Sequence, residues 1–496
     1  MRPGLLVIAA AWGCSASDPE RRRDGRGAEG IQDMDDSAIV HQCPDAFDRA
    51  ALPTRDAVEA ELASLVELGP QMAGSEANEQ WIMALEGRLA ALPGVTVERL
   101  RVPVPETTVM SGRMVGTWDG VSTDIPLQAV LPVSGNVDAP SRYVEPGAEP
   151  PDDIRGKVAL IELRFDGMAV DGLRSVLLFE SDPRGTLHGQ AEYAAGAWLE
   201  RPWLLTRTQQ QIDSVVDAGA VGVVLLGELS ADLAGDLHLQ LDAPSVPVVL
   251  VSDALARRLR DAARVGTGFQ AALEVDASQS GGTAGALRVR LGGATPEAVV
   301  LHAASDPLNV VEGSGAVALA GIVEALSSLD PGCRPRDLII DISPGHRSGF
   351  AGVGRLGAAL NGSDVAWVGV MAQAGAIEHL PDGAVGRGLV RTGLVEPRLL
   401  SVKGGSGLAE RVIEQSELDG LDRAWVLDRP EGFGAAVGLI EQGVPVVERH
   451  SGPWTLPFAR RGLAAVDATD LRSDAAWMGG LFLSTGVDSR AELAGE

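Results

Sequence analysis

The chain has 496 residues, of which 45% are hydrophobic, and its 41 Lys and Arg against 68 Asp and Glu give a formal net charge of -27. This length and composition exclude a disordered acidic tail and a disulfide-stapled miniature, because such a chain buries at least one large core, and they predict two or three domains. The charge excludes a nucleic-acid partner bound through its phosphate backbone, since that binding needs clustered cations.

The first residues have the pattern of an export signal. An apolar run over residues 5–12 follows Arg2 and precedes Gly13-Cys14-Ser15, after which the chain turns polar. The run is too short to span a bilayer but suits a secretory signal. Small residues followed by a cysteine resemble the lipobox of bacterial lipoproteins. That resemblance implies a signal peptide over 1–14, lipidation of Cys14 and a place in the cell envelope, at the outer membrane or facing the periplasm. The alternatives are a plain signal peptide with secretion and a chance pattern.

Residues 15–42 are rich in Arg, Asp, Gly and Ser without periodicity, which predicts a flexible tether. No later stretch reaches about 18 consecutive apolar residues, so no transmembrane helix is expected. Two further cysteines remain, Cys43 and Cys333. In an oxidising compartment they either pair or stay apart as a buried and an exposed thiol.

Hydrophobic spacing changes twice along the rest of the chain. Helical spacing over 58–66 and 81–92 predicts two helices, and residues 95–104 predict a strand. Residues from about 110 to 275 alternate short β-rich runs with helical stretches and Pro/Gly/Asp loops, which predicts a compact α+β insert. The β-rich runs lie at 158–164, 221–226 and 246–251.

From residue 298 onward, strands alternate with helices. Continuous β-branched runs predict the strands, and helical stretches follow Ser314 and Gly349. This alternation predicts an α/β fold, a mostly parallel sheet sandwiched by helices, in which ligands bind beyond the carboxyl ends of the strands. The strand candidates are 299–301, 338–342, 365–370 and 444–447. The predicted domains are a first part over 43–110, an insert over 111–280 and the main part over 281–496.

Three of the seven histidines follow predicted strands of this last region: His302, His346 and His450. Histidine is the commonest metal ligand and the usual acid or base near neutral pH, so the strand ends form a candidate site. His346 occupies a strand-to-helix turn between small residues. The alternatives are a solvated loop for His450 and a satisfied core position for His302. Asp306 and Glu312 are acidic candidates nearby, and Glu312 is either a general base or a carboxylate favoured at a helix start.

Two parts of the chain resemble a known family. Gly74-Ser-Glu-Ala-Asn-Glu, with the helix after it and Gly94-Val-Thr-Val-Glu, resembles the opening of the secreted di-zinc aminopeptidases, which include glutamate carboxypeptidase and transferrin-receptor relatives. The insert resembles a protease-associated domain in the runs that begin at Asp153, Asp217 and Ser245. Together the two resemblances imply a zinc-exopeptidase-like fold with an inserted protease-associated domain.

The family's chemistry implies two zinc ions held by His and carboxylates, with a Glu as general base. This chain departs from the pattern. The family's first His-x-Asp corresponds to residues 301–306, so His302 and Asp306 serve as metal ligands only with a shift of register. The paired glutamates fall on His346-Arg347. The remaining ligand positions fall near Val311 or Glu312, near Met371 and near Pro457.

Divergent bacterial relatives carry Gly-His in place of the paired glutamates, and Gly345-His346 with Glu312 is similar to them. The resemblance therefore implies Glu312 and His346 as the catalytic candidates and His302 and Asp306 as the metal candidates. Because at least three ligands are replaced, zinc is doubtful and the metal site is degenerate.

Two functions follow from these observations. The first is an exported, membrane-anchored peptidase-fold protein with lost or altered metal catalysis, which binds a peptide or a protein partner in its cleft. The alternative is an active metal-dependent exopeptidase or amide hydrolase. Without a carboxylate bridge, two dications would repel one another uncompensated, which argues for the first. A cleft that gathers His302, Glu312 and His346 would favour the second.

Overall fold

The computed structural model describes most of the chain after residue 42. The described residues are 43–44, 46–118, 120–242, 244–265, 269–345, 351–352, 355, 365–382, 388–428 and 443–495. They belong to one compact unit, Gln42–Glu496. Cys14, the predicted tether and His346 lie outside the described residues.

Two capped helices precede the first strand, as the hydrophobic spacing predicts. They are α1 (Arg55–Leu68) and α2 (Glu76–Ala90). The side chains of Thr54 and Ser75 each accept a hydrogen bond from the backbone N–H three residues on, which satisfies a donor that the first helical turn leaves free. The apolar face of each helix packs into the core. The buried apolar residues are Val58, Leu62, Leu65, Trp81, Ile82, Leu85 and Leu89.

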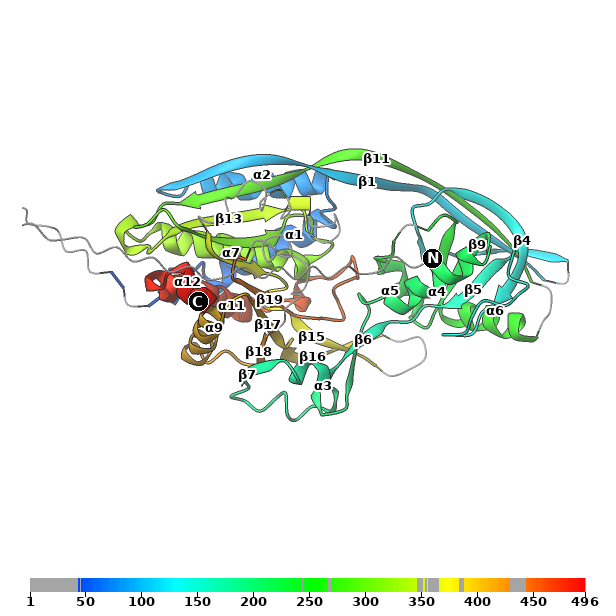
Figure 1. The fold of residues 1–496 in the computed structure, drawn as a ribbon. Helices are drawn as coiled ribbons and strands as arrows, with labels where there is room; N and C mark the ends of the chain where they lie inside the picture. The colour runs from blue at the N-terminus through cyan, green and yellow to red at the C-terminus, as the bar shows by residue number, and fades with distance from the viewer. Residues whose placement is uncertain are drawn as a thin grey trace, which may run out of the picture. The chain divides into compact units, whose positions relative to one another are not determined.

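Two long antiparallel strands, β1 (Val95–Trp118) and β11 (Gln270–Leu291), connect the two regions of the sheet (Figure 1). Their register runs from Val95 opposite Leu291 to Thr117 opposite Gln270. The predicted strand over 95–104 is confirmed but is too short. Its polar continuation stays extended because β11 supplies main-chain hydrogen-bond partners, which the local sequence does not reveal.

The central strands carry most of the predicted parallel sheet. β12 pairs in parallel with β13 and β14, and β14 pairs in parallel with β19. β17 and β18 are parallel to each other, whereas β17 is antiparallel to β19. These central strands are β12 (Ala298–Ala304), β13 (Asp337–Ser343), β14 (Val365–Met371), β17 (Arg398–Lys403), β18 (Ala424–Asp428) and β19 (Val446–His450). The predicted mostly parallel α/β sheet is confirmed.

Helices cover these strands because the strands are apolar on both faces. The largest core cluster joins them to α1, α2, α7 (Val310–Ser327), α9 (Ser406–Leu418) and α11 (Ala468–Ser484). Among the described helices, α7 alone is long and apolar enough to cross a membrane, and 89% of its most apolar window is buried in the protein. Such burial is the behaviour of a core helix.

The 111–280 segment builds its own part of the sheet with its own core. β4 (Gly135–Tyr143), β5 (Val158–Glu162), β9 (Gly222–Gly227) and β10 (Val248–Ser252) are parallel neighbours in the order β10-β9-β5-β4. Apolar clusters lie on both faces of these strands. They include residues of its helices α4 (Thr206–Asp217), α5 (Ala231–Asp236) and α6 (Asp253–Val265).

Part of the same segment also packs on the central strands. β7 (Leu177–Ser181) adds an antiparallel edge strand to β18. Tyr193 donates a hydrogen bond to the buried Glu378, which also pairs with Arg423. Cys43 and Cys333 form a disulfide with a Cα–Cα distance of 5.1 Å. Of the two alternatives open from the sequence, the two cysteines therefore pair.

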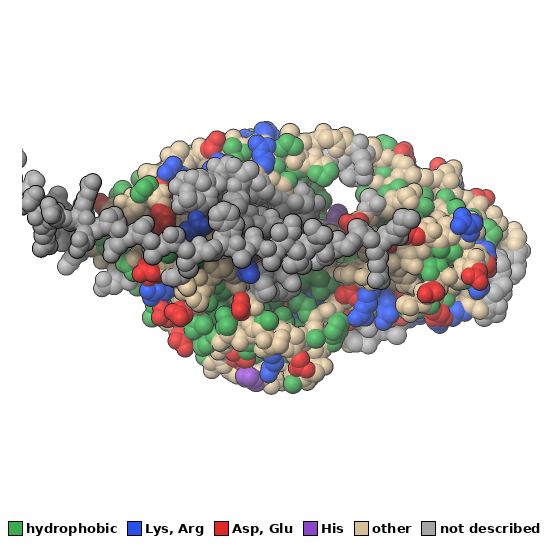
Figure 2. All heavy atoms as spheres, in the orientation of Figure 1, with side chains coloured by type: hydrophobic (Ala, Val, Ile, Leu, Met, Phe, Trp, Pro, Cys, Tyr) green, Lys and Arg blue, Asp and Glu red, His purple; other side chains and the backbone are tan. Residues whose placement is uncertain are grey.

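On the face drawn in Figure 2, acidic and basic side chains are interspersed.

The remaining elements are short connections and edges. The other strands are β2 (Val121–Ile125), β3 (Ala129–Val130), β6 (Asp166–Ala169), β8 (Trp198–Arg201), β15 (Ile377–Pro381) and β16 (Leu389–Val395). The other helices are η1 (Arg49–Ala51), α3 (Val170–Arg174), η2 (Ala191–Tyr193), η3 (Pro331–Cys333), η6 (Leu463–Ala465), η7 (Thr485–Val487) and α12 (Arg490–Ala494).

Candidate functional site

A cavity of about 160 Å³ lies at the carboxyl ends of the central parallel strands, where ligands bind in sheets of this kind. We call it the central cavity. Its polar lining groups come from β12, α7, β19 and the turn after β14, and they are His302, Glu312, Gln373, His450 and Ser451, with Gln240 from the 111–280 segment. Its apolar lining includes Ala304, Val370, Met371, Ala372, Leu399, Leu456 and Trp203.

His302 is held by a chain of two hydrogen bonds. Its Nδ1 lies 3.0 Å from Oδ2 of Asp341, the residue opposite it on β13, and Ser343 Oγ donates to the same carboxylate oxygen at 2.5 Å. All three side chains are buried. A carboxylate on Nδ1 fixes the orientation of the ring, an arrangement suited to a general base or an oriented hydrogen-bonding group. Hence His302 is both a satisfied core residue and a cavity residue.

Glu312 and Asp306 lie on either side of the turn that starts α7 and have different hydrogen-bond partners. Asn309 caps this helix by accepting from the N–H groups of Val311 and Glu312. Glu312 lines the cavity, is 6% exposed, and accepts a hydrogen bond from the Leu308 N–H at 2.6 Å. Asp306 instead accepts from the backbone N–H of Gly345, two residues after β13, at 2.7 Å.

The sequence candidates are thus only partly assembled in the described structure. His302, Glu312 and His450 line one cavity, with His450 Nε2 3.8 Å from Glu448 Oε2. Asp306 is not among the described lining residues. His346 lies outside the described residues, so its assignment as a catalytic candidate stays a prediction.

Sequence reasoning missed Asp341 and Gln373. A signal existed for Asp341, because it is the charged residue within the apolar run 338–342 and therefore needs a buried partner. Gln373 adopts a left-handed conformation with φ of 50°, and its Oε1 accepts the Ser451 N–H at 3.1 Å. Nothing in the local sequence marks that conformation, which is uncommon outside glycine.

A buried ion-pair cluster supports the floor of the cavity. Asp474 accepts hydrogen bonds from Arg398 at 2.6 Å and from Arg449 at 2.5 Å, and all three side chains are at most 1% exposed. Burial alone raises the pKa of Asp474, but the two guanidinium groups outweigh it and hold the pKa below its ordinary value. Arg449 also donates to the carbonyls of Ala372 and Gln373 at 2.7 and 2.8 Å, so the cluster fixes this part of the cavity wall.

No protein-family model matches the sequence, and no curated protein matches it. Solved structures do. A zinc aminopeptidase from Bacillus subtilis aligns with a TM-score of 0.60 at 15% identity, over 87% of this chain and 95% of that one. A peptidase M28 precursor from Shewanella amazonensis aligns with a TM-score of 0.61 at 16% identity, over 88% and 96%. The chain has the M28 aminopeptidase fold.

This fold result confirms the predicted zinc-exopeptidase-like architecture. An aminopeptidase from Aneurinibacillus sp. strain AM-1 agrees, with a TM-score of 0.56, 14% identity, and coverage of 88% of this chain and 95% of that one. At these identities the likeness concerns the backbone, and the chemistry has to be argued from the side chains of this chain.

The described lining of the central cavity does not fit a two-zinc centre. Within the described parts of the chain, Glu180, Asp182 and His188 form the one group whose ligand atoms lie close enough to hold a metal ion. That group belongs to β7 and the turn after it, and Asp182 there already accepts hydrogen bonds from the N–H groups of Thr186 and Leu187. The M28 fold is therefore present without a described cluster of zinc ligands at its strand ends.

Proposed function

We propose that the chain is an exported, lipid-anchored protein that keeps the aminopeptidase fold, lacks two-zinc catalysis, and binds the amino end of a peptide in the central cavity. The observation that carries this proposal is the lining. The described lining has one carboxylate, Glu312, where two zinc ions would need several ligands. Ala304, Met371 and Leu456 contribute apolar surface at the ends of the strands.

The size and polarity of the central cavity support a small amine with an apolar side chain. Its volume of about 160 Å³ is below the roughly 300 Å³ at which sites for drug-sized ligands begin, so it suits one residue. The described lining residues include no Lys or Arg, and the Glu312 carboxylate among them attracts an ammonium group. Met371, Leu399 and Leu456 offer contacts to an aliphatic side chain.

Isothermal titration calorimetry with leucinamide tests this proposal on the chain from Gln42 onward. We expect binding, a loss of about tenfold or more in Glu312→Gln, and no binding of N-acetyl-leucinamide, because the charge-assisted contact is gone in both cases. Glu410→Gln, at an exposed position on α9, is the matched control and should bind leucinamide as the unchanged chain does. Equal binding of leucinamide and its acetylated form would refute amine recognition.

Elemental analysis of protein purified without chelator tests the loss of zinc. We expect less than one zinc per chain and none taken up after zinc is added. About one or more zinc per chain, lost in His346→Ala, would overturn the proposal and favour a metal-dependent exopeptidase.

A second function, a metal-free amide hydrolase, is favoured by the pair of His302 and Asp341. Their 3.0 Å contact at the cavity wall is the geometry of a base oriented by a carboxylate. Leucine p-nitroanilide distinguishes the functions. Hydrolysis that survives chelator and disappears in His302→Ala would support the hydrolase, whereas no release of nitroaniline supports binding alone.

The proposed location is the bacterial cell envelope, with a membrane anchor at Cys14 and a peptide or protein ligand in the cavity. The disulfide between Cys43 and Cys333 supports export, because such bonds persist in oxidising compartments. We also propose that residues 111–280 are a protease-associated domain. Metabolic labelling with palmitate tests the anchor, and Cys14→Ser should abolish the label and release the chain from membranes.

A further inference from the structure

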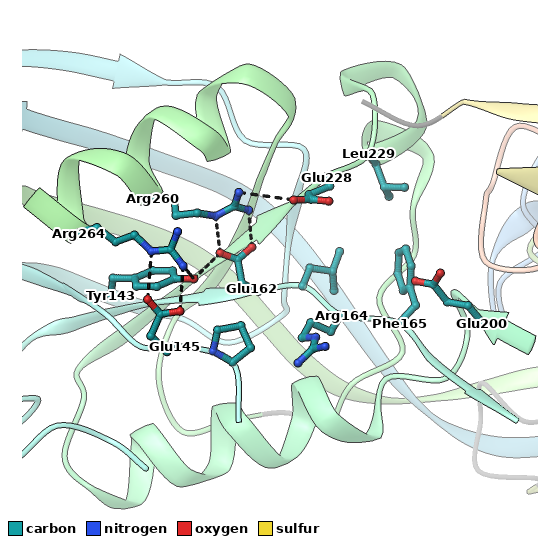
Figure 3. Close-up of a pocket in the computed structure, with 12 residues that line it drawn as sticks. Tyr143, Glu145, Glu162, Arg164, Phe165, Glu200, Glu228, Leu229, Arg260 and Arg264 are labelled. Atoms are coloured by element: carbon teal, nitrogen blue, oxygen red, sulfur yellow. Dashed lines mark hydrogen bonds and ion pairs between the residues drawn. The ribbon is translucent and has the colours of Figure 1, made fainter. Parts of the chain in front are cut away.

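A second hollow, of about 480 Å³, lies within the 111–280 segment (Figure 3). We call it the insert pocket. It opens at the carboxyl ends of the parallel strands β4, β5 and β9, beside α6, which is the ligand-binding edge of an α/β sheet. Its volume lies within the range of small-molecule and peptide sites.

Two of the three arginines of the insert pocket are satisfied by neighbouring carboxylates. Arg260 donates to both oxygens of Glu162 at 2.6 and 2.5 Å, and Arg264 donates to both oxygens of Glu145 at 3.1 and 2.9 Å (Figure 3). Tyr143 ties the two pairs together by donating to Glu162 at 2.8 Å. Glu162 and Arg260 form a fixed wall, because a bidentate arginine pair restricts both partners and these side chains are only 12% and 15% exposed, whereas Glu145 and Arg264 are about half exposed.

Arg164 is the third arginine and differs from the other two. Among the described residues its guanidinium has no hydrogen bond or ion pair, and Figure 3 draws no dashed line to it. Its main chain is fixed by Thr208, whose Oγ1 accepts the Arg164 N–H at 3.0 Å and donates to the Arg164 carbonyl at 2.9 Å. An exposed guanidinium with no protein partner can act as a bidentate donor for a carboxylate or a phosphate.

The other lining groups favour the carboxylate end of a peptide. Glu145, Glu162, Glu200 and Glu228 already put four carboxylates around three arginines, so a dianionic phosphate is repelled more than a single carboxylate. Phe165 adds an aromatic ring to the lining, which suits an apolar side chain. Arg164 also lines a further hollow of about 300 Å³, which leaves room for more than one residue.

We propose that the insert pocket binds the carboxyl end of a peptide, with Arg164 as the anchoring cation and the Glu162 and Arg260 pair as the fixed wall. The proposal does not rest on the function of the central cavity, because the two sites recognise opposite ends of a peptide.

The test is calorimetry of the full chain in detergent with N-acetyl-alanyl-leucine, which has a free carboxylate and no free amine. We expect binding, and a loss of about tenfold or more both for the C-terminal amide of the same probe and for Arg164→Gln. Arg258→Gln, an exposed arginine on α6 outside the pocket, is the matched control and should bind as the unchanged chain does. Circular dichroism and the midpoint of urea unfolding check that each variant is folded.

Three results would overturn the proposal. The first is equal binding of the free acid and its amide, or no loss in Arg164→Gln. The second is displacement of the probe by inorganic phosphate at the same concentration, which would make the pocket a general anion site. The third is a weaker affinity for the acetylated probe in Glu312→Gln, which would place that probe in the central cavity.

Discussion

The buried cluster of Asp474, Arg398 and Arg449 makes a quantitative prediction for Asp474→Asn. The substitution removes the negative charge but keeps the size of the side chain. It takes from Arg449 the carboxylate with which it pairs, and it leaves Arg398 with Asp470 alone, 3.2 Å away, although both arginines are at most 1% exposed. Removing one partner of a buried ion pair costs about 3–5 kcal/mol, and here two arginines share the lost partner. We therefore expect the free energy of unfolding to fall by at least about 3 kcal/mol, a large part of the stability of a typical domain.

Urea unfolding followed by circular dichroism measures this loss. Glu59→Gln is the control, because its pair with Arg55 on α1 is exposed on both sides and is worth about 0.5 kcal/mol. The folded fraction of Asp474→Asn should also bind leucinamide more weakly, since Arg449 holds the carbonyls of Ala372 and Gln373 at the cavity wall. A loss below about 1 kcal/mol would refute the reasoning, because it would mean that both guanidinium groups find other partners.

The same cluster sets a pH dependence. The folded pKa of Asp474 lies below its ordinary value, so the unfolded state binds more protons as the pH falls. The stability contributed by this carboxylate is therefore complete above about pH 4 and is lost as the pH falls through the folded pKa. The unchanged chain should lose stability in this acid range, and the loss should be smaller in Asp474→Asn. An identical acid dependence in both would contradict the assigned role.

Three further outcomes follow from the structure. Burial raises the pKa of Glu396 to about 7, so the free energy of unfolding should fall by a few kcal/mol as the pH rises from about 4.5 to 7, and Glu396→Gln should flatten this dependence in urea melts between pH 5 and 8. Replacing Cys43 and Cys333 by Ala opens a loop spanning 290 residues and should lower stability by about 2–4 kcal/mol, with reductant then having no further effect on the melting curve. Gly315→Ala should destabilise by about 1–3 kcal/mol in urea melts, because its Cβ would lie 2.1 Å from the Met371 carbonyl oxygen, and an unchanged midpoint would show that α7 can shift.

Much of the fold was readable from local patterns. Short runs such as 338–342 are apolar at nearly every position and rich in β-branched residues, which is typical of a strand buried on both faces, so their alternation with helical stretches predicted a parallel sheet between helices. The helix starts at Thr54 and Ser75 were marked by hydroxyl side chains that cap the first turn. The grouping of His302 and Glu312 at one edge also followed, because parallel strands bring their carboxyl ends together.

Other features depended on partners far away in the chain. The polar part of β1 after Val104 is a strand because it lies against β11, and β7 leaves the 111–280 segment to join β18. These pairings are made by main-chain hydrogen bonds between distant segments. Nearly every residue type can form such bonds, so the local sequence does not identify the partner strand.

The candidate site shows the same division. Composition and spacing alone indicated an acidic chain with a mostly parallel α/β layout, and the resemblance to the zinc aminopeptidases implied too few carboxylates for two zinc ions at the expected positions. Only the tertiary structure decided that Asp341 orients His302, that Asp306 accepts the Gly345 N–H, and that Arg164 has no described partner while Arg260 is paired. The physical reason is that a hydrogen-bond partner is chosen by position in space, and residues tens to hundreds of positions apart come together only when the chain folds.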